Sequence, residues 1–254
     1  MCTLVILRRP GHRWPLMLAA NRDEMGDRPW RPPGRHWLDR AEVVAGMDEL
    51  AGGSWLGIND YGVVAGVLNR RGSLGPAADR RSRGELVLEA LDHGDAREAA
   101  EALADLETRS YRSFNLVVAD HRDAYWLCHR DDRGYGGIEL RPVPPGLSML
   151  TDYDLNDRSS PRIRDYLPQF RAAAAPDPDR DDWRAWQGLL ASRVHDAGAG
   201  PTGAMNISTR TGFATLSSSL IAVPAADQPA GLKPRWRFAP GHPDEVAYAA
   251  VELG

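Results

Sequence analysis

The chain has 254 residues, 43% of them apolar, and a formal net charge of −4 at pH 7. This length and apolar content suffice for a full hydrophobic core, and we expect residues 1–254 to form one large domain or two poorly separated ones. The nearly balanced charge, with no basic patch interleaved with aromatic residues, argues against a nucleic-acid partner. No apolar run approaches the ~20 residues that cross a bilayer, so an integral membrane segment is not expected.

Short apolar runs bounded by Gly, Pro, Asn or Asp predict antiparallel strands in the first 70 residues. They cover residues 4–7, 15–20, 43–45, 55–58 and 63–68. A turn around Gly11 joins the first two strands as a hairpin. The segment 28–33, which contains three prolines, is predicted to be a loop. Gly52 and Gly53 predict a turn with close backbone packing, because no Gly-Lys-Ser/Thr follows as in a phosphate loop.

From Ser82 onwards the apolar period becomes helical. Ser82 and Glu85 predict a capped helix that ends near Gly94, and Asp95 begins a second helix. Strands are then expected at 114–119, 124–128, 146–151, 206–209 and 214–223, and helices at 160–175 and 181–194. The order β, αα, β, αα, β predicts an α+β fold with two helical layers around two antiparallel sheets.

Cys2 is the first candidate catalytic residue. Removal of Met1 is sterically permitted before a small side chain, and it would leave a thiol and a free α-amine on one residue. An α-amine with an ordinary pKa of ~7.7–8.0 can act as general base for a thiol whose ordinary pKa is ~8.5. This pairing is the chemistry of an N-terminal nucleophile. The alternative is that Cys2 is an inert residue that opens the first strand.

A second polar feature, Asn21-Arg22-Asp23-Glu24, directly follows the second predicted strand. The hairpin brings this polar block back beside Cys2, next to the potential nucleophile. The alternative is a solvated strand exit. Because neighbouring residues of a strand point to opposite faces, Arg22 and Asp23 cannot both point at Cys2 unless the strand has already ended.

Four sequence blocks together resemble the NRDE family, also called the transport-and-Golgi-organisation type. The blocks are Met1-Cys2-Thr3, Asn21-Arg22-Asp23-Glu24, Gly52-Gly53-Ser54-Trp55-Leu56-Gly57 and Val67-Leu68-Asn69-Arg70-Arg71. That family resembles in turn the cysteine N-terminal-nucleophile hydrolases, such as penicillin V acylase and bile salt hydrolase, which cleave amide bonds. The resemblance implies a four-layer αββα sandwich with antiparallel sheets.

The resemblance also implies roles for individual residues. Asn69 would donate to an oxyanion, and Asp23 would hold the α-amine of the nucleophile Cys2. Two positions depart from the pattern of the hydrolases. Ala20 stands where the hydrolases carry an arginine, and Asp152 stands where they carry an asparagine. Because an ionised carboxylate has no hydrogen to donate, Asp152 cannot replace the hydrogen bond from that asparagine to the oxyanion. The candidate substrate-binding residues are Asn21, Arg22, Asp152 and Arg210.

Two functional hypotheses follow. The first is an N-terminal-cysteine hydrolase or acyltransferase that acts on an amide or thioester of a small acyl substrate. The second, which the resemblance implies as well, is a non-catalytic trafficking protein that binds haem or an acyl lipid in the same cleft. No cofactor is expected, and the seven scattered histidines show no metal-ligand spacing. Two cysteines and an opening without a signal-like leader predict a cytoplasmic protein.

Overall fold

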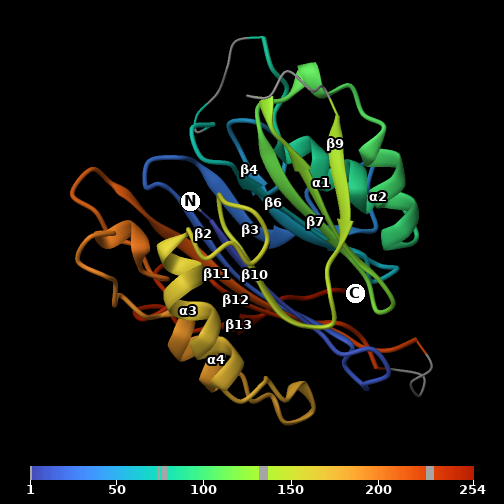
Figure 1. Cartoon of the computed structure of the whole chain (residues 1–254). Helices are drawn as coiled ribbons and strands as arrows, with labels where there is room; N and C mark the ends of the chain where they lie inside the picture. Colours follow the sequence, from blue (N-terminus) through green and yellow to red (C-terminus); the bar gives the residue numbers. More distant parts are fainter. Residues whose placement is uncertain (1, 74, 76–78, 132–136, 227–231) are drawn as a thin grey trace. The chain divides into compact units, whose positions relative to one another are not determined.

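A computed structural model describes residues 2–73, 75, 79–131, 137–226 and 232–254. Within these residues the chain forms four α-helices and two antiparallel sheets, which confirms the predicted α+β class. The chain divides into two compact units. The first comprises residues 1–28 and 145–252, and the second comprises residues 29–144 and 253–254. Each unit contains one sheet and one pair of helices (Figure 1).

The first unit is built on a sheet with the strand order β10-β1-β2-β11-β12-β13. Its strands are β1 (Thr3–Arg8), β2 (Leu16–Met25), β10 (Gly146–Leu150), β11 (Phe213–Val223), β12 (Arg235–Ala239) and β13 (Ala249–Ala250). Helices α3 (Pro161–Ala172) and α4 (Arg184–Leu190) lie against this sheet (Figure 1). The buried apolar cluster beneath them includes Val5, Met17 and Phe170. Val5 and Met17 therefore mark the face of the sheet that the two helices cover.

The second unit is built on a sheet with the order β3-β4-β5-β6-β7-β8-β9. Its strands are β3 (Trp30–Gly34), β4 (Val43–Asp48), β5 (Leu56–Asn59), β6 (Val64–Asn69), β7 (Phe114–Ala119), β8 (Ala124–His129) and β9 (Ile138–Pro142). Helices α1 (Gly84–Leu91) and α2 (Ala96–Ala104) pack on it through a buried cluster that contains the predicted apolar stripe Leu86, Ala90 and Leu91.

Glycines allow the chain to turn and pack closely before β5. Gly52 has a φ of +72°, in the left-handed region that favours glycine. A Cβ atom placed on Gly53 would lie 2.5 Å from the carbonyl carbon of Gly84, at the start of α1. The predicted turn with close backbone packing is therefore confirmed.

The strand β2 is longer than predicted, because residues 21–25 continue it beyond residue 20. Its partner β11 pairs with β2 along its whole length, from Phe213 opposite Met25 to Val223 opposite Leu16, with a bulge between Thr215 and Ser217. The polar block is thus part of a central strand and is not a solvated exit. The partner that sustains it lies about 190 residues further along the chain, where local sequence patterns cannot reveal it.

The segment 28–33 was predicted to be a loop, and this is wrong, because β3 occupies residues 30–34. β3 is an edge strand, where a proline needs no hydrogen-bonded partner on its outer side. Its pairing with β4 is irregular between Arg31 and Gly34, where the two consecutive prolines lie.

Several other boundaries differ from the prediction. The capping box at Ser82 does not form: its hydroxyl accepts from the main-chain nitrogen of Gly84, and α1 begins there. Helix α4 is shorter than residues 181–194, and residues 206–209 form only an isolated bridge between Ser208 and Ala214. The short strands β9, β12 and β13 were not predicted. None of the helices within the described ranges is long and apolar enough to cross a bilayer.

Candidate active site

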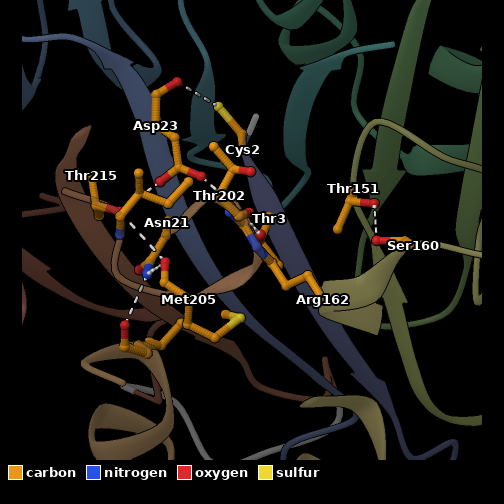
Figure 2. A network of polar contacts seen from close by, with 12 residues as sticks. Cys2, Thr3, Asn21, Asp23, Thr151, Ser160, Arg162, Thr202, Met205 and Thr215 are labelled. Carbon is orange, nitrogen blue, oxygen red and sulfur yellow. Dashed lines mark hydrogen bonds and ion pairs between the residues drawn. The ribbon is translucent and has the colours of Figure 1, made fainter. Parts of the chain in front are cut away.

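The candidate site is positioned by the pairing of β1 with β2, in which Thr3 lies opposite Asn21. Continuing this register by one residue sets Cys2 beside Arg22. The sulfur of Cys2 lies 3.7 Å from the main-chain oxygen of Asp23 (Figure 2). The potential nucleophile and the polar block, which are about twenty residues apart in sequence, are therefore in contact within the first unit.

Strand alternation divides the polar block between the two faces of the sheet. The side chains of Asn21 and Asp23 are bonded to residues that lie on the side of α3 and α4. Arg22 therefore points to the opposite face, where the continued register also places Cys2. Both Arg22 and Asp23 are buried. Because β2 does not end before this block, the two charged side chains act on the nucleophile from different sides of the sheet.

The carboxylate of Asp23 is held by two buried groups. The guanidinium of Arg162, in the first turn of α3, forms an ion pair with Oδ2 at 2.9 Å, and the two side chains are 3% and 0% exposed. The hydroxyl of Thr215 on β11 donates to Oδ1 at 2.7 Å. Arg162 also donates to the hydroxyl of Thr3 and to the main-chain oxygen of Thr202 (Figure 2). The network thus joins β1, β2, β11 and α3 next to the candidate nucleophile.

Asn21 is committed to hydrogen bonds within the protein. Its side-chain nitrogen donates to the main-chain oxygens of Leu190 at 3.0 Å and Met205 at 2.9 Å. Its side-chain oxygen accepts from the hydroxyl of Ser218 at 2.6 Å. These bonds use both amide hydrogens and give Asn21 a structural role. Its assignment to substrate binding stays a prediction.

The environment of Cys2 disfavours its thiolate. Burial raises the pKa of the Cys2 thiol, and the negative charge of Asp23 acts in the same direction, whereas the positive charge of Arg22 lowers this pKa. Cys2 is nevertheless partly exposed, in contrast to the buried Cys128. A thiol of this kind needs a nearby base to become a nucleophile at neutral pH.

The remaining predicted residues lie in three different places. Asp152 is buried and lies just after β10. Leu150 of β10 pairs with Leu4 of β1, and continuing this register by two residues sets Asp152 opposite Cys2. Arg210 is exposed in the turn that precedes β11. Asn69 is the last residue of β6 in the second unit. The functional roles assigned to these residues stay predictions.

Sequence reasoning missed Arg162 and Thr215, although α3 carried a signal. Pro161 and Arg162 occupy the first turn of α3, which contains no acidic residue. A cation is disfavoured there because the helix dipole is positive at its N-terminus. A buried arginine at this position therefore indicates an anionic partner. Among the described residues, no cluster of three or more His, Cys, Asp or Glu side chains is arranged to hold a metal ion.

The fold is shared with solved hydrolases. The Caenorhabditis elegans N-acylethanolamine-hydrolyzing acid amidase ortholog is similar with a TM-score of 0.57 and 11% identity, covering 89% of this chain and 94% of that one. The C2A mutant of the conjugated bile acid hydrolase from Clostridium perfringens has a TM-score of 0.50 and 10% identity, covering 99% of this chain and 97% of that one. The chain therefore has the fold of the N-terminal-nucleophile hydrolases.

The family follows from the sequence comparison. Residues 1–193 match the model of the family described as Transport and Golgi organisation 2, and the chain belongs to this family. The Transport and Golgi organization protein 2 homolog of Homo sapiens is 36% identical over 141 residues, covering 52% of this chain and 50% of the human protein. The chain thus spans about half the length of the curated relatives it matches. The resemblance drawn from the four sequence blocks is confirmed.

The Thr215 hydroxyl is expected to stabilise the fold, because it also accepts from the main-chain nitrogen of Ile207 at 2.8 Å. Thr215→Val removes this acceptor and the donor to Asp23, so the buried main-chain nitrogen of Ile207 loses its bond to Thr215 and the Asp23 carboxylate loses one of its hydrogen bonds. We expect the free energy of unfolding to fall by about 1–3 kcal/mol, measured by urea denaturation. Thr215→Ser keeps the hydroxyl and should lose less. Equal stability of the Val variant and the parent would contradict this account.

The pH dependence of Cys2 alkylation tests the influence of Arg22. Loss of the positive charge in Arg22→Gln removes a cause that lowers the thiol pKa, so the thiol pKa should rise further. Alkylation of Cys2 by iodoacetamide, followed by peptide mass spectrometry, should then need a higher pH than in the parent. Arg158→Gln, at an exposed position before α3, is the matched control and should leave the profile unchanged. A profile for Arg22→Gln that stays in place or moves to lower pH would show that Arg22 does not act on the thiol.

Proposed function

We propose that this protein is an N-terminal-cysteine hydrolase or acyltransferase that acts on an amide or thioester of a small acyl substrate. The observation that carries the proposal is the contact of the Cys2 sulfur with the main-chain oxygen of Asp23, next to the point where the start of β1 pairs with β2, in a chain with this fold. The solved relatives add support, since one is named an acid amidase that hydrolyses N-acylethanolamines and the other a conjugated bile acid hydrolase. The latter was solved with alanine in place of a cysteine at its position 2.

The proposed reaction begins after removal of Met1. The α-amine of Cys2 takes the thiol proton, and the sulfur attacks the acyl carbon of the substrate. Asn69 and main-chain amides stabilise the resulting oxyanion. The bond from the acyl carbon to the leaving nitrogen or sulfur breaks, and the ammonium group of Cys2 returns its proton to the leaving group. Water or another acceptor then attacks the thioester on Cys2 and gives up a proton to the amine. The bond from the acyl carbon to the sulfur breaks, and the ammonium group returns this proton to the sulfur, which regenerates the free thiol and the neutral amine.

Charged side chains near Cys2 bear on the choice of substrate. Arg22 is on the same face of the sheet by strand alternation, and we propose that its guanidinium binds an acidic group of the substrate. Asp152, level with Cys2, would disfavour a second anionic group at that position. Arg210 completes the proposed set of substrate-binding residues. We also propose a cytoplasmic location, which two free cysteines support.

The exchange of the nucleophile tests the proposal. In Cys2→Ala we expect turnover of N-acylethanolamines, conjugated bile acids or acyl thioesters to fall by about 10³-fold or more, because the attacking atom is gone. Cys128→Ala, a change at a buried cysteine of β8, should keep its turnover per folded molecule and serves as the matched control. A Cys2→Ala variant as active as the parent on every substrate that the parent turns over would end the proposal.

A second candidate function is a non-catalytic trafficking protein that binds haem or an acyl lipid. The raised pKa of the Cys2 thiol favours it, because such a thiol is largely protonated at neutral pH. Titration with haem, followed by absorbance, should then show saturation at one haem per chain. An unchanged haem spectrum would rule out the haem version. Binding of a fluorescent fatty acyl probe without turnover would then be the test of the lipid version.

A further inference from the structure

We propose that Arg162 is a positioning residue that compensates the charge of Asp23 and thereby keeps the α-amine of Cys2 in its neutral, basic form. The inference rests on the proposed function, because it concerns the base of the proposed reaction. Arg162 lies on α3, about 140 residues from Asp23 in the sequence, and none of the four family blocks contains it.

The strand register places the amine beside Asp23. Thr3 lies opposite Asn21, so the chain preceding Thr3 runs past Arg22 and towards Asp23. The contact of the Cys2 sulfur with the main-chain oxygen of Asp23 confirms this course. After removal of Met1, the leading nitrogen belongs to Cys2 and lies at this level of the sheet. The charge of Asp23 acts on the Cys2 thiol, and it must act on an amine of the same residue as well.

A lone carboxylate at this position would impair the proposed base. A negative charge next to an amine favours the ammonium form, especially where burial weakens the screening by water. An ammonium group cannot take the proton of the thiol. The Arg162 guanidinium, 2.9 Å from Asp23 Oδ2, makes the pair neutral as a whole and so reduces this effect. Because a carboxylate offers about four acceptor sites, Asp23 can still accept a hydrogen bond that orients the amine.

Arg162 is fixed in place by contacts other than Asp23. Its guanidinium donates to the main-chain oxygen of Thr202 at 2.9 Å and to the hydroxyl of Thr3. The helix that carries it begins at a cap, where the hydroxyl of Ser160 accepts from the main-chain nitrogen of Ile163. The hydroxyl of Thr151, just after β10, bonds to the hydroxyl of Ser160 at 3.2 Å (Figure 2). These contacts keep the Arg162 guanidinium at a fixed distance from the Asp23 carboxylate.

Within the first unit, the charged groups around the amine come from several elements. Arg22 and Asp23 lie on β2, Asp152 follows β10, and Arg162 lies on α3. Residues 215–217 of β11, which lie beside β2 here, are all uncharged. Arg162 and Asp23 form a direct ion pair on the helix-covered face. Substitutions in this pair therefore change the local charge while Arg22 and Asp152 remain.

Nuclear magnetic resonance on [15N]cysteine-labelled protein tests the inference directly. The chain contains two cysteines, so the free amine of Cys2 is distinguished from the peptide nitrogen of Cys128. The 15N shift of Cys2 is followed against pH. In Arg162→Gln we expect the midpoint of the Cys2 amine titration to rise by about one pH unit or more. Below the midpoint, this rise reduces the fraction of neutral amine about tenfold. Arg162→Lys keeps the charge and should titrate near the parent.

A second pair of variants decides the question if Arg162→Gln does not fold. Asp23→Asn leaves the guanidinium uncompensated, and the amine midpoint should fall. Adding Arg162→Gln to Asp23→Asn removes both charges, and the midpoint should return towards that of the parent. A purely structural role of Arg162 predicts no such reversal, and an unchanged midpoint across these variants would overturn the inference.

The same spectra separate this inference from the proposed function. If Met1 is retained, the nitrogen of Cys2 is a peptide nitrogen that does not titrate, and both proposals fail. If the Cys2 amine titrates with the same midpoint whether or not Arg162 carries its charge, the inference fails while the hydrolase proposal stands. The hydrolase proposal alone would fail if the midpoints shift as expected and Cys2→Ala retains full turnover.

Discussion

The antiparallel pairing that sets Thr3 opposite Asn21 is the constraint on which the proposed chemistry depends. It brings the start of the chain alongside the polar block of β2 and decides which side chains share a face with Cys2. A slip of one residue would exchange the two faces, moving Asp23 away from α3 and Arg22 towards it. The register is held from both sides, because β10 pairs with β1 and β11 pairs with β2 along its length.

The buried network around Asp23 reinforces this register. Removing two charges from water is costly, so an ion pair such as Asp23 with Arg162 contributes less to stability than to a defined arrangement. Breaking the pair by removing one partner leaves a buried charge and typically costs about 3–5 kcal/mol. Thr215 and Arg162 approach the same carboxylate from β11 and α3. The helical layer of the first unit is thereby connected to the residue that touches the candidate nucleophile.

The periodicity of apolar residues correctly predicted helices and hairpins that are formed by residues close together in the sequence. α2 begins after Asp95, which caps it through the main-chain nitrogen of Glu98, and the hairpin of β7 and β8 also lies where expected. The errors at β2 and β3 fall where the place of the strand in its sheet decides. β2 continues through a polar block because β11 pairs with it, and β3 carries prolines because it is an edge strand. Such pairings cannot be derived from composition or period alone.

The candidate site, like the fold, was predictable where its residues lie close together in the sequence. Sequence blocks identified Cys2, Asp23 and their neighbours in β2, because those residues are close to one another along the chain. Arg162 and Thr215 were missed, since each reaches Asp23 from a segment more than 130 residues away. An arginine in the first turn of α3 was the one local signal, and its meaning depends on the partner that the fold supplies.

The central claim is that the thiol and a free α-amine belong to the same residue, Cys2. An aldehyde that condenses only with a terminal aminothiol measures this directly, through the mass of the first peptide of the purified protein. We expect the peptide to begin at Cys2 and to carry one thiazolidine ring per chain. A first peptide that begins at Met1 and remains unmodified would contradict the account.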